Sequence, residues 1–282
     1  MKRVGFDWVA RGSCRHPEIM TMSGGSLCSA DFPAHVGIIR HPDAGVLLFD
    51  TGYDEAFLRA TQRWPERLYR LATPVDFTGA GDWPGWLAAN GVAAGDIRGV
   101  IVSHFHGDHI AGLHQIPDVP VYCAGAGLES VRRGSRLRRV TQGLLGDLVG
   151  PDVEGRARFF EDAPAIALPA AFAPLVEGRD ILGDGSLIAV ELPGHCQGHW
   201  GLALRTGDDR HVLLAADAVW SGKAITACRP PPRITTALLG HTRTYRETLG
   251  KLHQAQASNS GLAILPSHCA ASAAAFRQDD VV

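Results

Sequence analysis

Histidine and aspartate side chains are concentrated in residues 104–109, whose sequence is HFHGDH. Buried imidazole rings and carboxylates are costly unless something satisfies them, and a metal ion satisfies several at once. In a segment that runs from extended chain into a turn, His104 and His106 project to the same side, and Asp108 and His109 follow around the turn. One loop can therefore supply ligands to two neighbouring metal positions.

Three further candidate ligands lie downstream, each shortly after a predicted strand. They are His195 after the apolar run 187–192, Asp217 after 212–216 and His268 after 262–265. Polar groups that follow several strands indicate one site at a single edge of the sheets. Imidazole and carboxylate ligands suit Zn²⁺, and a catalytic zinc site keeps one position open for water. The sequence therefore predicts a catalytic metal site, with manganese or iron as open alternatives to zinc.

The elements that position these residues follow from the apolar pattern. Runs 35–39 and 45–49 flank a Pro-Asp turn and predict a β-hairpin. Further strands are predicted at residues 99–103, 119–123, 187–192, 201–205, 212–216 and 262–265. Helices are predicted at residues 54–71 with a break at Pro65, at 83–90, within 126–149 and around 245–252, whereas the alanine-rich tail after Cys269 is expected to fray. Helices interleaved with two groups of strands predict a layered α/β fold with a sheet-on-sheet core.

Composition limits the classes of partner. The 282 residues are 45% hydrophobic, enough for a substantial core, and no linker divides them. With 27 basic and 29 acidic side chains, the net charge of -2 gives no overall attraction for nucleic acid or an anionic membrane, so such a partner would need a local patch. Six cysteines without a CxxC pair, no apolar leader and no spanning run predict a cytoplasmic protein without nucleic-acid or membrane partners.

The order of these motifs resembles that of the metallo-β-lactamase-fold hydrolases. The matching motifs are residues 103–109 (SHFHGDH), 193–195 (PGH), 216–217 (AD) and 267–268 (SH), preceded by 50–52 (DTG), which resembles the family's early structural aspartate motif. The likeness spans residues 35–268. It implies a four-layer αββα fold, with two mixed β-sheets between helices, as a single domain over residues 1–282.

The resemblance also implies a dinuclear zinc site. It assigns His104, His106 and His195 to one ion, Asp108, His109 and His268 to the second, and Asp217 to a bridge between them. Two divalent ions that share one water lower its pKa from about 15.7 to near 7, so a bridging hydroxide can attack an ester carbonyl. Asp108 is the expected proton shuttle, while Asp50 and His199 are expected to support the ligands. Seven other histidines are expected to be surface or structural residues: His16, His35, His41, His114, His211, His241 and His253.

The motif pattern is most similar to that of N-acyl homoserine lactone lactonases, which implies a small acyl lactone as substrate. Those enzymes usually carry a tyrosine three residues after the bridging aspartate, where its phenol bonds the substrate carbonyl. This chain has Trp220 there, which we expect to contact substrate. The long interval between His109 and His195 is expected to hold a substrate cap around residues 125–180.

Two other functions remain open at this stage. A thioesterase could act on an acyl-carrier-protein or coenzyme A thioester, and the five arginines of Arg132–Arg139 would suit an acidic carrier. A metal-retaining binding or regulatory protein with little turnover would need the same ligands. A homodimer is also left open.

Overall fold

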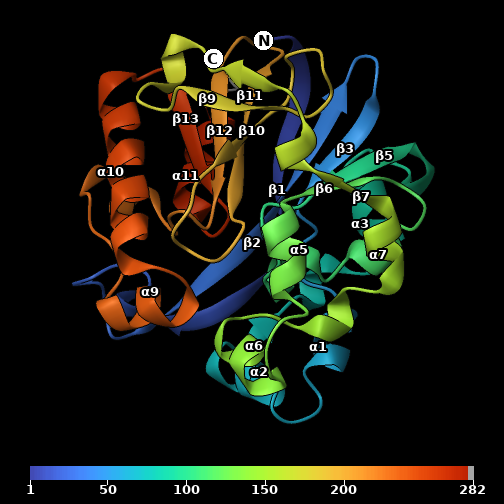
Figure 1. Ribbon diagram of the computed structural model, residues 1–282, viewed down its shortest axis with the longest axis vertical. Helices are drawn as coiled ribbons and strands as arrows, with labels where there is room; N and C mark the ends of the chain where they lie inside the picture. Colours follow the sequence, from blue (N-terminus) through green and yellow to red (C-terminus); the bar gives the residue numbers. More distant parts are fainter. Residues whose placement is uncertain (279–282) are drawn as a thin grey trace.

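The computed structural model describes residues 1–278 and contains two mixed β-sheets (Figure 1). The first sheet has the order β7-β6-β5-β3-β2-β1, with β4 on β1. Its strands are β1 (Arg3–Pro17), β2 (Ser29–His41), β3 (Gly45–Phe49), β4 (Val75–Asp76), β5 (Ile97–Ile101), β6 (Val121–Cys123) and β7 (Ala157–Phe159). β3, β5, β6 and β7 run parallel, whereas β1, β2 and β3 are antiparallel.

The second sheet has the order β8-β9-β10-β11-β12-β13. Its strands are β8 (Ala165–Ala167), β9 (Glu177–Asp180), β10 (Ile188–Glu191), β11 (Trp200–Thr206), β12 (His211–Ala216) and β13 (Leu262–Pro266). The first residues of β1 pair in parallel with the end of β11 and join the two sheets. The predicted hairpin and the other predicted strands are confirmed, with ends that shift by a few residues.

Alternation along the strands creates a core on both faces of each sheet. On β3, Leu47 and Phe49 face the layer between the sheets, where they meet Leu202 and Leu214 of the second sheet. Leu48 points the opposite way, into the layer beneath the helices. Two buried sheet faces between two helical layers form the αββα arrangement that the resemblance implied.

Helices cover the outer face of each sheet. Those on the first sheet are α1 (Glu55–Ala60), α2 (Arg67–Ala72), α3 (Trp83–Ala89), α4 (Gly107–Ile110), α5 (Gly125–Ser130), α6 (Arg136–Thr141) and α7 (Pro151–Arg156). On the second sheet, α8 (Gly222–Thr226) and α10 (Thr242–Ser258) pack on the outer face, and α9 (Arg233–Leu239) contacts α10. The last helix, α11 (Ala270–Gln278), packs instead against the layer between the sheets. Short 3-10 helices span Glu18–Met20, Thr78–Ala80, Ala94–Asp96, Leu113–Gln115, Gly146–Leu148, Phe160–Asp162 and Ala170–Phe172.

Most predicted helix boundaries agree with the structure, but the C-terminal expectation was wrong. The break at Pro65 separates α1 from α2, and α3 ends just before Gly91, whose φ of 69° suits glycine. The alanine-rich tail does not fray; it forms α11, which buries Ala273 and Phe276. The Phe276 ring packs edge-on against that of Phe6 at 5.6 Å, and this contact holds the helix in place.

Residues 125–180, the expected cap, divide into two parts. Residues 125–156 contain α5, α6 and α7, whereas β7 adds to the first sheet, and β8 and β9 add to the second. The expected cap therefore consists of a helical segment, residues 125–156, and a following segment whose strands extend the two sheets.

Candidate metal centre

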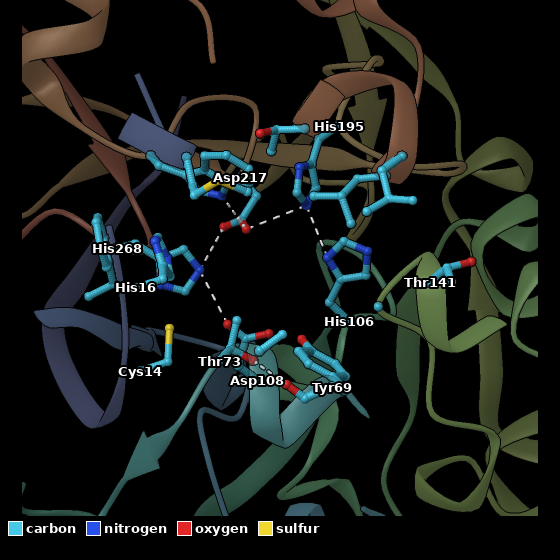
Figure 2. Close-up of a pocket in the computed structure, with 18 of the residues that line it drawn as sticks. Cys14, His16, Tyr69, Thr73, His106, Asp108, Thr141, His195, Asp217 and His268 are labelled. Atoms are coloured by element: carbon cyan, nitrogen blue, oxygen red, sulfur yellow. Dashed lines mark hydrogen bonds and ion pairs between the residues drawn. The ribbon is translucent and has the colours of Figure 1, made fainter. Parts of the chain in front are cut away.

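The seven candidate ligands meet at one edge of the two sheets, beyond the ends of four strands. Figure 2 labels His106, Asp108, His195, Asp217 and His268 among them. The ligand loop follows β5, His195 follows β10, Asp217 follows β12 and His268 follows β13. All seven side chains are buried. Tertiary structure thus brings together residues from four separate parts of the chain.

The first group of ligand atoms comes from three histidines. Nε2 of His195 lies 3.0 Å from Nδ1 of His106, and the imidazole of His104 completes the group. Cys196 also belongs to this group, with its sulfur within 4.8 Å of the other ligand atoms.

The second group contains Asp108, His109 and His268. Nε2 of His268 lies 3.2 Å from Oδ2 of Asp108, and Nε2 of His109 lies 3.6 Å from the same oxygen. Oδ1 of Asp217 lies 3.1 Å from His268 and 3.5 Å from His109, whereas its Oδ2 lies 3.4 Å from Nε2 of His195. Asp217 therefore presents one carboxylate oxygen to each group.

Unsatisfied buried atoms test whether this arrangement suits metal ions. Nε2 of His104, Nε2 of His109 and Oδ1 of Asp217 are buried and have no hydrogen-bond partner among the described residues. A buried polar group without a partner costs about 1–3 kcal/mol, so these atoms fit a site that is completed by cations. The donor set of imidazole nitrogens and carboxylate oxygens suits a divalent transition metal.

The electrostatic environment also favours ligation. Burial, with help from positive charge on His109 and His106, lowers the pKa of His104 well below its usual range, and burial does the same for His195. Although burial opposes the shift, His268 and His109 lower the pKa of Asp217 well below its usual range. Neutral imidazoles and an ionised carboxylate are the forms that bind metal.

Hydrogen bonds to neighbouring groups orient several of these rings. Nδ1 of His109 donates to Oδ2 of Asp50 at 2.7 Å, and Ser103 donates its N–H and its hydroxyl to Asp50 at 2.8 Å each. Nδ1 of His268 donates to the Pro33 carbonyl at 2.7 Å. In both rings Nδ1 is committed to this bond, so Nε2 is the nitrogen that faces the centre.

His199 acts on the backbone of a ligand. Its Nδ1 donates to the Leu192 carbonyl at 2.9 Å, and its Nε2 accepts from the N–H of Asp217 at 3.0 Å. Burial lowers the pKa of His199 to about 4, which keeps Nε2 free to accept. His199 therefore helps to fix the backbone of Asp217.

Comparison of the amino-acid sequence with known protein families shows to which family this site belongs. Residues 30–257 match the profile of the metallo-β-lactamase superfamily. The chain belongs to this superfamily. Membership implies divalent metal binding and supports a metal-dependent hydrolase.

Several relatives within the superfamily are similar to this chain. A probable metallo-hydrolase of Mycobacterium tuberculosis is 28% identical over 194 residues, which is 66% of this chain but only 56% of that protein. The N-acyl homoserine lactonase AiiB of Agrobacterium fabrum is 26% identical over 242 residues, covering 84% of this chain and 80% of AiiB. A solved structure of a variant of AiiA from B. thuringiensis, with N-decanoyl-L-homoserine at its active site, superposes with a TM-score of 0.69 at 15% identity, over 100% of this chain and 97% of that chain. That likeness supports the shared fold.

A cavity of about 520 Å³ lies beside the two groups of candidate ligands. Its walls are largely apolar and include Phe32, Leu68 and Leu239, while ligand side chains form part of its lining. Polar side chains that the sequence interpretation missed also line it, among them His16, which stacks on Phe32 at 4.0 Å, and Tyr69 from α2. No local pattern marks either residue, because long-range packing alone brings them to the cavity.

Trp220 lines the same cavity, but its polar atom does not face a free acceptor. The indole Nε1 donates to Oδ2 of Asp217 at 2.7 Å. This is the oxygen that faces His195. Trp220 is thus bonded to a candidate ligand, and its ring contributes apolar surface to the cavity.

The arginine-rich segment is partly neutralised within the chain. Arg132 pairs with Glu154, Arg133 with Glu129 and Arg136 with Glu66, the last through two hydrogen bonds of 2.9 and 2.6 Å. These three side chains therefore help to hold α2, α5, α6 and α7 together.

In the part of the chain that the structure describes, no helix is both long and apolar enough to cross a bilayer.

Proposed function

We propose that this protein is a dinuclear metal-dependent hydrolase that opens the ester bond of a lactone carrying an aliphatic acyl chain. One observation carries the proposal: Asp217 shares its two carboxylate oxygens between two buried ligand groups beside an apolar cavity. The names of lactonase relatives such as AiiB support the choice of a lactone.

The proposed ions are two Zn²⁺. His104, His106 and His195 would hold one, Asp108, His109 and His268 the other, and Asp217 would lie between them. Divalent ions bound there would lower the pKa of water and polarise an ester carbonyl. The chain itself supplies orientation, a proton carrier and the exclusion of bulk water.

Asp108 is the proposed proton carrier. Its side chain lines the cavity, and its Oδ2 lies beside Nε2 of His268. Burial opposes ionisation, but His109 and His268 lower the pKa of Asp108 and keep it in the carboxylate form, which is the form that takes up a proton. Ester opening requires a proton to reach the leaving alkoxide, and Asp108 is placed to deliver it.

Tyr69 is the proposed donor to the substrate. Tyr69 lines the cavity from α2, and a phenolic O–H can donate a hydrogen bond to a carbonyl oxygen. Figure 2 shows Tyr69 beside Asp108 and His106. Because the N–H of Trp220 is taken by Asp217, Tyr69 is better placed than Trp220 to bond a substrate carbonyl.

The cavity favours an aliphatic substituent on the lactone. Met20, Phe32, Leu68, Leu238 and Leu239 give it an apolar lining of a size that suits a medium acyl chain. The α6 segment also reaches this cavity through Val140, Thr141 and Gly143. We propose that this segment is the effective part of the cap expected over residues 125–180.

A substrate panel tests the proposal on purified protein whose metal content has been counted. Medium and long N-acyl homoserine lactones are compared with an acyl thioester and a β-lactam. We expect preferential lactone opening that a chelator abolishes, with two metal ions per chain. Preferential thiol release would assign the site to a thioesterase, and a fully metallated protein that only binds the lactone would assign it to a binding role.

A further inference from the structure

Three segments border the mouth of the cavity: residues 61–73, 131–143 and 229–241. Each contributes lining residues, among them Tyr69, Thr141 and Leu238. Their helices α2, α6 and α9 lie at one end of the molecule, opposite the end where the chain termini are marked (Figure 1). We call the exposed side of these three segments the mouth surface.

Arginine is concentrated at the mouth surface. The three segments hold ten arginines and one glutamate, with no lysine or aspartate, although the whole chain has a net charge of -2. Net charge alone indicates no anionic partner, but the charges are unevenly distributed. The mouth surface is therefore a strongly cationic patch on a chain that is slightly acidic overall.

Within residues 1–278, most of these arginines have no acidic partner. Arg132, Arg133 and Arg136 form the ion pairs described above. Seven others make no ion pair with a carboxylate of the described residues: Arg63, Arg67, Arg70, Arg138, Arg139, Arg229 and Arg233. Their positive charge is available to a partner.

The same surface exposes large apolar side chains. Six of the molecule's ten exposed large hydrophobic residues within the described chain lie on it: Trp64, Leu68, Leu71, Leu137, Ile234 and Leu238. Trp64 is 60% exposed and Ile234 is 75% exposed. Exposed apolar side chains gathered around a cavity mark an interaction site, since the rest of the surface shows few of them.

We propose that the mouth surface docks onto an anionic lipid surface. Arginines would bind the phosphate headgroups, while Trp64, Leu71 and Ile234 would enter the boundary of the acyl chains. The apolar lining continues this surface inward through Leu68 and Leu238, so an acyl chain could pass from lipid to cavity without crossing water. A second copy of this chain fits the surface poorly, because a two-fold contact would place the arginines of both copies against each other.

Vesicle binding tests the docking, and it does not depend on the proposed reaction. The metallated protein is mixed with phosphatidylcholine vesicles with or without phosphatidylglycerol, at low and high salt. Trp64 reports on contact, because the other tryptophans, Trp8, Trp83, Trp86, Trp200 and Trp220, are buried. We expect co-sedimentation and a blue shift of tryptophan fluorescence only with phosphatidylglycerol, both reversed by high salt. Trp64→Phe should abolish the shift while co-sedimentation persists.

Charge-reversal variants separate a local patch from net charge. The test variant combines Arg67→Glu, Arg138→Glu and Arg233→Glu, one exposed arginine from each segment. Since each basic side chain near an anionic bilayer contributes about 1 kcal/mol, the test variant should bind roughly 100-fold more weakly. The control combines Arg98→Glu, Arg158→Glu and Lys251→Glu, which changes net charge equally outside the mouth surface. The control should bind much more tightly than the test variant.

Four results would overturn the proposal. They are no binding of the native protein at low salt, equal loss in both triple variants, lipid-free dimers in which Trp64 fluorescence is already blue-shifted, and retention on an immobilised acidic polypeptide but not on the vesicles. The third result would assign the mouth surface to a contact between copies, and the fourth to an acidic protein. Circular dichroism of both variants checks that each one is folded before binding is compared.

Discussion

Replacing Trp220 with phenylalanine separates two roles for this residue. The sequence predicts a substrate contact, whereas the structure shows its indole N–H bonded to Oδ2 of Asp217 at 2.7 Å. A hydrogen bond to a charged group contributes about 1.5–3 kcal/mol, which corresponds to roughly 10–150-fold in a binding constant. If the bond holds Asp217 in its bridging position, Trp220→Phe should weaken metal binding by an amount in this range.

Competition with a chromophoric chelator measures that affinity without any substrate. Trp200→Phe is the matched control, because Trp200 is equally buried and its ring packs against Phe160 rather than against Asp217. The control should retain native metal affinity. Unchanged metal affinity in folded Trp220→Phe, with a rise in KM for the lactone, would refute the structural reasoning and restore the role of substrate contact.

Three further predictions follow from the same geometry. Tyr69→Phe should lower kcat/KM for the lactone by about 10-fold or more, since it removes one donor to the carbonyl. It should also weaken the binding of an acyl lactam analogue, measured by calorimetry. Tyr122→Phe, which lies outside the cavity, should change neither quantity. Burial lowers the pKa of His35 to about 4. As the pH falls, the His35 imidazole is therefore protonated in the unfolded chain before it is protonated in the folded protein. The free energy of unfolding should fall by about 3 kcal/mol between pH 6.5 and pH 4. Denaturant titrations of His35→Gln should show a smaller loss, while exposed His241→Gln should behave like the native protein. Removing metal with a chelator should lower the melting temperature, because ions at 100 times their Kd stabilise the fold by about 2.7 kcal/mol; an unchanged calorimetric transition would mean that the unsatisfied atoms of the centre have other partners.

The ligand groups could be predicted from sequence because residue type and strand boundaries carry the information. The HFHGDH segment concentrates metal-binding side chains, and Asp217 and His268 each follow a recognisable apolar strand. Their meeting at one sheet edge follows from the layered fold. Which ions they hold is not encoded in the same pattern, since imidazole and carboxylate ligands accept several divalent metals.

The cavity walls could not be predicted in the same way. His16 lies near the end of β1 and Tyr69 lies on α2, and neither has neighbours in sequence that indicate a site. Their positions depend on how the long hairpin and α2 pack in three dimensions. The fraying predicted after Cys269 failed for a related reason, because alanine gives a weak apolar signal and only the packing of Phe276 on Phe6 reveals α11 as part of the core.

The helix α2 joins the proposed chemistry to the proposed docking surface. Tyr69 turns its phenol toward Asp108, while Leu68 and Leu71 on the same short helix are exposed. Glu66, just before α2, is held by Arg136 of α6 through two hydrogen bonds, so the two helices at the mouth are fixed to each other. Since Trp220 donates to Asp217, the proposed donor to substrate is Tyr69, at the mouth of the cavity, rather than a residue in the loop after β12. On this proposal, a partner that displaces α2 would also displace Tyr69 from the substrate carbonyl.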